Sequence, residues 1–148
     1  MYKNILIATD GSDLADEAIQ HGLSLAKELS AKTTIVTATE IWSASDIAAR
    51  TESGETDAIK LYEDFQASRA KKILTEAESK ANSIGVACET IHVRDRHPAE
   101  GIIETANSRN VDLIVMASHG RRGIKKVLLG SVANEVVSHS PVPVLICR

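Results

Sequence analysis

Aromatic residues are scarce in this chain of 148 residues, because one Trp, two Tyr and one Phe make up only 3% of it. Hydrophobic residues nevertheless account for 43% of the sequence, which excludes a chain too polar to fold. The core must therefore be built from Ile, Leu, Val and Ala. The length suits one domain with a core of its own.

Cysteine is also rare. The two cysteines, Cys88 and Cys147, lie far apart, and each falls within a run typical of a strand. Neither has a partner at the spacing of metal ligands, and the histidines show no such spacing either. We expect both thiols to behave as small buried hydrophobic groups.

Long apolar runs and a large charge excess are missing as well. No stretch approaches the roughly 18 apolar residues needed to span a membrane. Lys3 and Asn4 precede only a short apolar run, unlike the start of a secretory signal peptide. The formal net charge of −3 argues against nucleic acid as the main partner. We therefore expect a soluble cytoplasmic protein with no membrane insertion.

Short apolar runs alternate with helical patterns along the chain. Strands are predicted at residues 5–9, 33–39, 86–93, 111–117 and 142–147. Helices are predicted after an N-cap at Ser12, from 58 to 84, from Pro98 to Asn110 and from 131 to 138. This alternation predicts an open parallel sheet with helices on both faces.

Individual residues make these predictions more specific. Gly22 in the middle of the first helix indicates close packing on the sheet. Phe65 falls on the apolar face of the long helix, and Ile103 falls on that of the next one. Pro143 cannot donate to a strand ladder, so strand 142–147 is expected at a sheet edge or in an unusual pairing. Residues 40–57 lack a clear period and predict an irregular connection, in which Trp42 either covers a site or anchors the segment to the core.

The segment from Met116 to Val132 is the main candidate for a binding site. A buried strand runs into a loop with three glycines and four cations, and the loop leads into a helix. Glycines allow backbone N–H groups to approach a ligand, and a helix N-terminus favours an anion. In open parallel sheets, ligands bind beyond the carboxyl ends of the strands. If the first and fourth strands are neighbours, this loop meets Asp10 there.

Several of these residues also have plain structural explanations. Asp10 before Gly11 and Ser12 is common turn chemistry as well as a ligand for ribose or a hard cation. Ser131 can start the helix and contact a phosphate at once. The four cations are Arg121, Arg122, Lys125 and Lys126; Arg121 is the first candidate for a phosphate contact, and the others are expected on a solvated face. His119 is expected to make a structural hydrogen bond rather than to act as an acid or base.

Four stretches of the sequence resemble the universal stress protein family: 5–12, read ILIATDGS; 118–120, read SHG; 130–132, read GSV; and 141–146, read PVPVLI. Its nucleotide-binding branch carries Gly, two residues, Gly, nine residues and then Gly-Ser or Gly-Thr. Here nine residues separate Gly120 from Gly130-Ser131, and Ala117 stands in place of the first glycine. The extra methyl fits if φ at Ala117 is negative and causes strain if φ is positive.

The resemblance implies one universal stress protein domain over residues 1–148, with strand order 3-2-1-4-5 in a Rossmann-like, adenine nucleotide alpha hydrolase-like fold. It implies that ATP, with Mg or Mn, lies across the ends of strands one, two and four. Asp10 would sit near the ribose or a divalent ion held through the nucleotide. The other implied site residues include Ala8 and Thr9, and the backbone of Ala38 would pair with the adenine edge. Met116 and Ala117 would lie beside the adenine and ribose. The residues implied at the phosphates are Gly120, Arg121, Gly130, Ser131 and Val132.

Three functions follow from the sequence. The first is a nucleotide-responsive stress or signalling module, which the resemblance also implies to be a homodimer through strand 142–147 and to act on a protein partner that the sequence leaves unknown. The second is a slow ATPase, although there is no Walker A pairing of Lys with Ser or Thr. The third is a dimeric interaction protein of the same family that binds no nucleotide.

Overall fold

The computed structural model describes residues 1–40, 45, 48–49, 52, 54, 57–120 and 128–148. Within them the elements are β1 (Asn4–Ala8), α1 (Asp13–Leu29), β2 (Lys32–Ala38), α3 (Ala58–Ser83), β3 (Cys88–Val93), α4 (Pro98–Ser108), β4 (Leu113–Ala117), α5 (Ser131–His139) and β5 (Val144–Cys147). The strands form one five-stranded sheet in the order β3-β2-β1-β4-β5. All neighbouring strands are parallel. The predicted fold class and strand order are confirmed.

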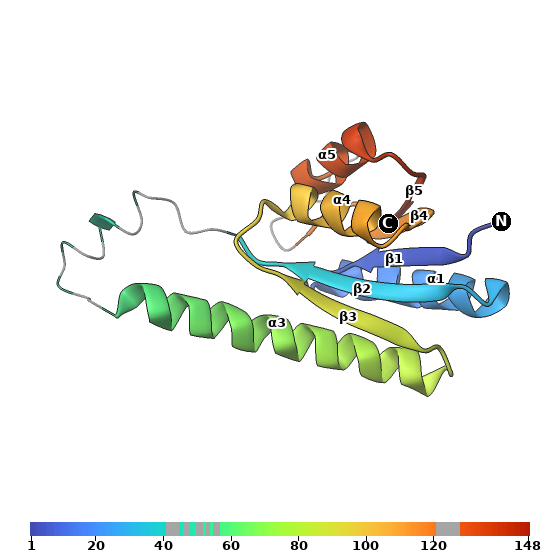
Figure 1. Ribbon diagram of the computed structural model, residues 1–148, viewed down its shortest axis with the longest axis horizontal. Coiled ribbons are helices and arrows are strands. Elements are labelled where there is room, and N and C mark those ends of the chain that lie inside the picture. Colours follow the sequence, from blue (N-terminus) through green and yellow to red (C-terminus); the bar gives the residue numbers. More distant parts are fainter. Residues whose placement is uncertain (41–44, 46–47, 50–51, 53, 55–56, 121–127) are drawn as a thin grey trace.

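Helices cover both faces of the sheet (Figure 1). α1 and α3 pack on one face, over a core that includes Ile7 and Ile35. α4 and α5 pack on the other face, over Leu6 and Ile114. Because side chains alternate along a strand, each central strand supplies both cores, and this explains its unbroken apolar sequence.

Two local predictions about α1 are confirmed. The Ser12 hydroxyl accepts a hydrogen bond from the Ala15 N–H at 3.2 Å, so Ser12 is the N-cap. A Cβ on Gly22 would lie 2.7 Å from Cδ1 of Ile7, closer than real side-chain contacts allow. Glycine at this position lets α1 approach β1.

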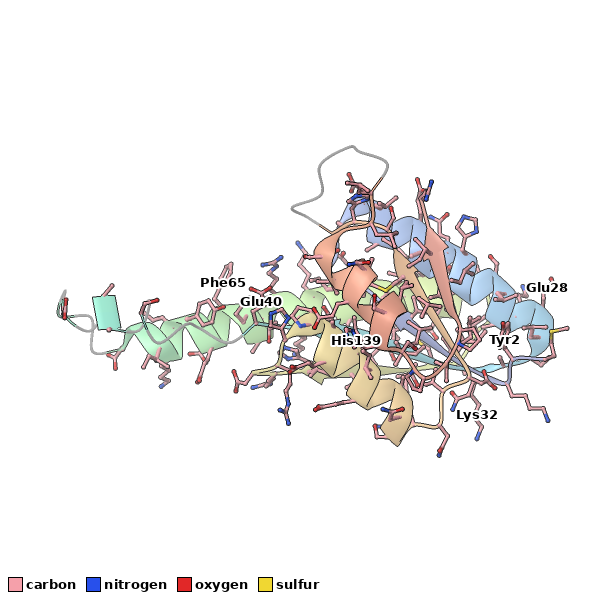
Figure 2. All side chains as sticks on the ribbon, turned by 90° about the horizontal axis from the view of Figure 1, so that it is seen from above. Tyr2, Glu28, Lys32, Glu40, Phe65 and His139 are labelled. Carbon is pink, nitrogen blue, oxygen red and sulfur yellow. The ribbon has the colours of Figure 1, made fainter. Side chains whose placement is uncertain are left out.

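The N-terminal half of α3 runs past the sheet (Figure 1). Its C-terminal half buries Leu74 and Ala77, whereas Leu61 is 68% exposed and Phe65 is 64% exposed. Phe65, which helical spacing placed on the apolar face of the helix, is exposed because the helix continues beyond the strands that it covers. Figure 2 shows Phe65 on this extension. Ile103 of α4, also predicted on the inner face, is only half-buried.

β5 lies at the edge of the sheet, as Pro143 predicted. The strand begins one residue after that proline, at Val144, so the missing N–H falls outside the ladder. The Pro143 carbonyl still accepts from the Ile114 N–H at 3.0 Å. Of the two thiols, Cys147 is buried and Cys88 is half-buried. Burial raises the pKa of both, with smaller contributions from Glu78 beside Cys88 and Glu17 beside Cys147, so both stay protonated near neutrality.

Candidate functional site

The end of β1 forms a tight turn that fixes Asp10. The Thr9 N–H donates to the Val36 carbonyl at 2.9 Å and continues the ladder for one more residue. Gly11 then adopts φ +76°, a conformation that favours glycine. Oδ1 of Asp10 accepts from the Ser12 N–H at 2.9 Å, which orients the half-buried carboxylate at the carboxyl end of the sheet. The structural explanation of Asp10 as a turn residue is therefore correct, and the turn places a carboxylate where a ligand would bind.

The end of β4 meets this turn. A Cβ built on Gly120 would lie 2.5 Å from Oδ2 of Asp10, so the Asp10 carboxylate lies directly against the Gly120 backbone. The pairing of β1 with β4 brings them together, as the sequence predicted. Met116, Ala117 and the next residue, Ser118, are all buried. The candidate crevice is the region bounded by the Asp10 turn, the end of β4 and the start of α5.

The methyl of Ala117 fits this backbone without strain. Ala117 is the last residue of β4 and has extended backbone, whereas the non-glycine residues with positive φ in the described part of the chain are Ser30, Asp95 and Asn110. Its side chain is 8% exposed and belongs to the core beneath α1. The negative-φ condition for replacing the signature glycine with alanine is met.

The backbone of Ala38 faces the gap left where β1 ends. Because the Val36 carbonyl accepts from Thr9, the polar groups of Val36 point toward β1. Those of Ala38, two residues later, point to the same side. β1 has turned away at Asp10 by then. Ala38 thus presents a strand edge to the crevice, as needed to pair with a planar base.

The N-terminus of α5 closes the other side of the crevice. Gly130 is its N-cap, and the Gly130 N–H donates to the Ser118 carbonyl at 2.8 Å. That N–H is therefore already engaged within the protein. The N–H groups of Ser131 and Val132, in the first helical turn, have no acceptor within the helix. These two are the amides best placed for an anion.

Charge distinguishes the N-termini of the two helices that follow β1 and β4. The first turn of α1 carries Asp13 and Asp16, which already complement its dipole, whereas the first turn of α5 has no acidic residue. An anionic group is thus favoured at α5. The predicted cations Arg121, Arg122, Lys125 and Lys126, like Trp42, lie outside the described residues.

A second polar group, which the sequence did not predict, flanks Ala38. Oγ1 of Thr39 lies 2.9 Å from Nε2 of His92, and Tyr62 of α3 donates to the Glu40 carbonyl at 3.4 Å. Burial lowers the pKa of His92, the Arg94 charge lowers it further, and Asp95 partly opposes them. Strand pairing of β2 with β3 creates this contact, for which the linear sequence carries no signal.

A cavity of about 710 Å³ lies at the opposite, amino end of the strands. Lys32, Cys88, Glu89 and Arg109 are among the residues that line it. Figure 2 shows Lys32, at the start of β2, well separated from Glu40, which follows the end of that strand. Arg109 is neutralised by Glu89 at 2.7 Å, and the C-terminus of α1 next to the cavity disfavours an anion. Size alone does not make this cavity the better nucleotide site.

One further observation limits what the site holds. Among the described residues, no three His, Cys, Asp or Glu side chains gather in a way that could hold a metal ion. An ion at Asp10 would take its remaining ligands from a nucleotide and from water, and carboxylate oxygen suits Mg or Mn.

In the described part of the chain, no helix has the length and apolar character to cross a bilayer.

Comparisons with known proteins point in one direction. The sequence model of the universal stress protein family matches residues 1–148. Universal stress protein YxiE of Bacillus subtilis is 35% identical over 155 residues, with both chains covered in full. The structure of MJ0577 from Methanocaldococcus jannaschii superposes with a TM-score of 0.81 at 27% identity, covering 99% of this chain and 96% of the other. A universal stress protein solved in complex with cAMP gives a TM-score of 0.74 at 27% identity, with coverages of 99% and 97%.

Proposed function

The chain belongs to the universal stress protein family, and from this membership we propose that it binds an adenine nucleotide, ATP in the first place, at the carboxyl ends of β1, β2 and β4. In this role it is a nucleotide-responsive stress or signalling module of the cytoplasm. The complex of a relative with cAMP supports adenine nucleotides as the ligand class. Binding, without a hydrolytic step, is the activity proposed.

The convergence of three unlike elements carries the proposal. Ala38 offers a backbone edge for the base, Asp10 offers carboxylate oxygens for ribose hydroxyls, and the first turn of α5 offers N–H groups for phosphate. The contact between Asp10 and the Gly120 backbone joins the second element to the loop that leads to the third. A nucleotide has these three chemistries in the same order.

A divalent ion completes the proposed site. A phosphate chain close to Asp10 places like charges side by side, and this disfavours binding without a cation. Mg or Mn bound through the phosphates would offset the repulsion, with Asp10 as a direct or water-mediated ligand. Met116, Ala8 and Thr9 would form the buried floor under the base and ribose, and Arg121, with Gly120 and Gly130, would border the phosphates.

We also propose that two copies associate through β5. This strand has no neighbour on its outer side within the described sheet, and an unpaired edge can extend into a second copy. Leu145 on the strand is 40% exposed and Val137 on α5 is 45% exposed, which gives this side an apolar component.

The direct test uses purified protein and two matched carboxylates. Bound nucleotide is released with acid and identified, and ATP with magnesium is then titrated into stripped protein by calorimetry. Asp10→Asn keeps an oxygen for the Ser12 N–H but removes the charge, and it should weaken binding at least tenfold. Asp13→Asn, on the exposed first turn of α1, is the control and should not weaken it. No copurifying nucleotide and no binding at millimolar ATP would refute the proposal and favour the dimeric interaction protein.

A further inference from the structure

The sharp turn after β4 links the floor of the crevice to the start of α5. The Ser118 N–H donates to the Cys147 carbonyl at 2.8 Å, and the Ser118 carbonyl accepts from the Gly130 N–H at 2.8 Å. Ser118 is therefore fixed to β5 on one side and to the N-cap of α5 on the other. His119, the next residue, is carried on this fixed backbone.

The imidazole of His119 packs against the N-cap of α5. A Cβ built on Gly130 would lie 3.4 Å from Cα of His119 and 3.6 Å from its ring carbon Cδ2. On the other side of the ring, Nδ1 lies 3.0 Å from Oγ of Ser118, a buried residue. These two contacts fix the orientation of the ring.

That orientation determines where the second ring nitrogen lies. In imidazole, Nε2 is bonded to Cδ2, the ring carbon nearest to Gly130. Nε2 thus adjoins the edge of the ring that faces Gly130, the N-cap of α5. The predicted structural hydrogen bond of His119 is present, but it uses only one of the two nitrogens.

We propose that His119 binds the phosphate chain of the nucleotide through Nε2 and so makes the site selective for phosphorylated over unphosphorylated adenine compounds. In the tautomer in which the Ser118 hydroxyl donates to Nδ1, the ring proton is on Nε2. Nε2–H is then a fixed donor that adds to the N–H groups of Ser131 and Val132. A phosphate oxygen is the matching acceptor, whereas adenosine has no group that reaches this end of the crevice. The inference rests on the nucleotide-binding function proposed above.

The test compares ATP with adenosine on variants that separate the two nitrogens. His119→Asn places an amide near the position of Nδ1 and keeps a partner for Ser118, but it lacks the reach of Nε2. It should lose about tenfold in affinity for ATP with magnesium and less than twofold for adenosine. His119→Gln places its amide near Nε2 and should recover most of the affinity for ATP. His139→Asn, at the other end of the same helix (Figure 2), is the matched control and should change neither.

The outcomes separate this inference from the function on which it rests. Wild-type protein that binds neither ATP nor adenosine refutes the nucleotide site as a whole. Wild-type binding of ATP with an unchanged His119→Asn variant refutes only the role of His119. Equal losses for ATP and adenosine also overturn it, because they would show that the ring merely holds the turn in place. Thermal unfolding of each variant accompanies the titrations, and the Gln variant keeps the test decisive if the Asn variant unfolds.

Discussion

Gly120→Ala should weaken nucleotide binding strongly while leaving the fold almost intact. The backbone of Gly120 is not in the positive-φ region, so alanine can adopt it. The new Cβ, however, would lie 2.5 Å from Oδ2 of Asp10, and the carboxylate would have to retreat by about 0.9 Å to reach an ordinary contact of 3.4 Å. Only the far end of a short side chain has to move, which limits the cost to stability.

The expected magnitude comes from the hydrogen bonds of Asp10. A retreat of that size displaces Oδ2, which is proposed to accept from ribose, whereas the 2.9 Å bond from the Ser12 N–H is made to the other oxygen, Oδ1. A hydrogen bond to a charged group contributes about 1.5–3 kcal/mol, which corresponds to roughly a 10- to 100-fold loss of affinity. The lower chain entropy of unfolded alanine returns about 0.4–1 kcal/mol of stability. The midpoint of thermal unfolding should therefore move little.

Calorimetric titration with ATP and magnesium, paired with thermal unfolding, measures both effects. Gly130→Ala is the informative comparison, because its Cβ would meet the Ser118 carbonyl at 3.1 Å, a backbone atom that cannot move alone. That variant should lose more stability than Gly120→Ala. Wild-type affinity in Gly120→Ala would refute the claim that the Asp10 turn and the β4 loop form one site.

Three further predictions concern stability and assembly. Gly22→Ala should destabilise the protein by about 1–2 kcal/mol in denaturant unfolding, because its methyl meets a fully buried isoleucine of β1. Gly101→Ala, whose methyl meets a half-buried valine of β3, should be nearly neutral. A larger loss of stability in Gly101→Ala than in Gly22→Ala would contradict this account of the packing. The pKa of His92 is lower in the folded than in the unfolded chain, so the contribution of neutral His92 to folding stability is complete above the unfolded pKa near 6.5 and is lost as the pH falls below it. His92→Gln should therefore flatten the dependence of the free energy of unfolding on pH between about pH 7 and 5, and an unchanged slope would contradict this. Leu145→Lys should turn a dimer into a monomer in light scattering, whereas Leu61→Lys on the α3 extension should not; a dimer that survives the first change would exclude the β5 edge.

The fold could be predicted because the sequence pattern and the packing agree. Strands buried on both faces read as continuous apolar runs, and this holds for 5–8 and 113–117. Ser12 and Gly22 have mechanisms that act within one helix or between neighbouring elements, so their roles could be inferred early. Periodicity, however, gives only the direction in which a side chain points. It carries no information about where the sheet ends, and for this reason the exposure of Phe65 was missed.

The candidate site was predictable in outline and not in its hydrogen bonds. The alternation of strands and helices indicated that Asp10 and Gly120 both follow the carboxyl ends of parallel strands, and the pairing of β1 with β4 brings them together. The engagement of the Gly130 N–H by Ser118 depends on how the loop after β4 returns to α5. The pair of Thr39 and His92 likewise depends on the register of two strands separated by a long helix. Such contacts arise only from the three-dimensional arrangement.

The central claim, that ATP binds at the carboxyl ends of the strands, is tested most directly by an NMR titration of ¹⁵N-labelled protein with ATP and magnesium. The backbone amides of Ala38, Ser131 and Val132 should shift together, at one saturating concentration. Those of Thr34 and Glu89, at the amino-end cavity, should stay in place. Shifts confined to the amino-end cavity, or none at millimolar ATP, would contradict the account.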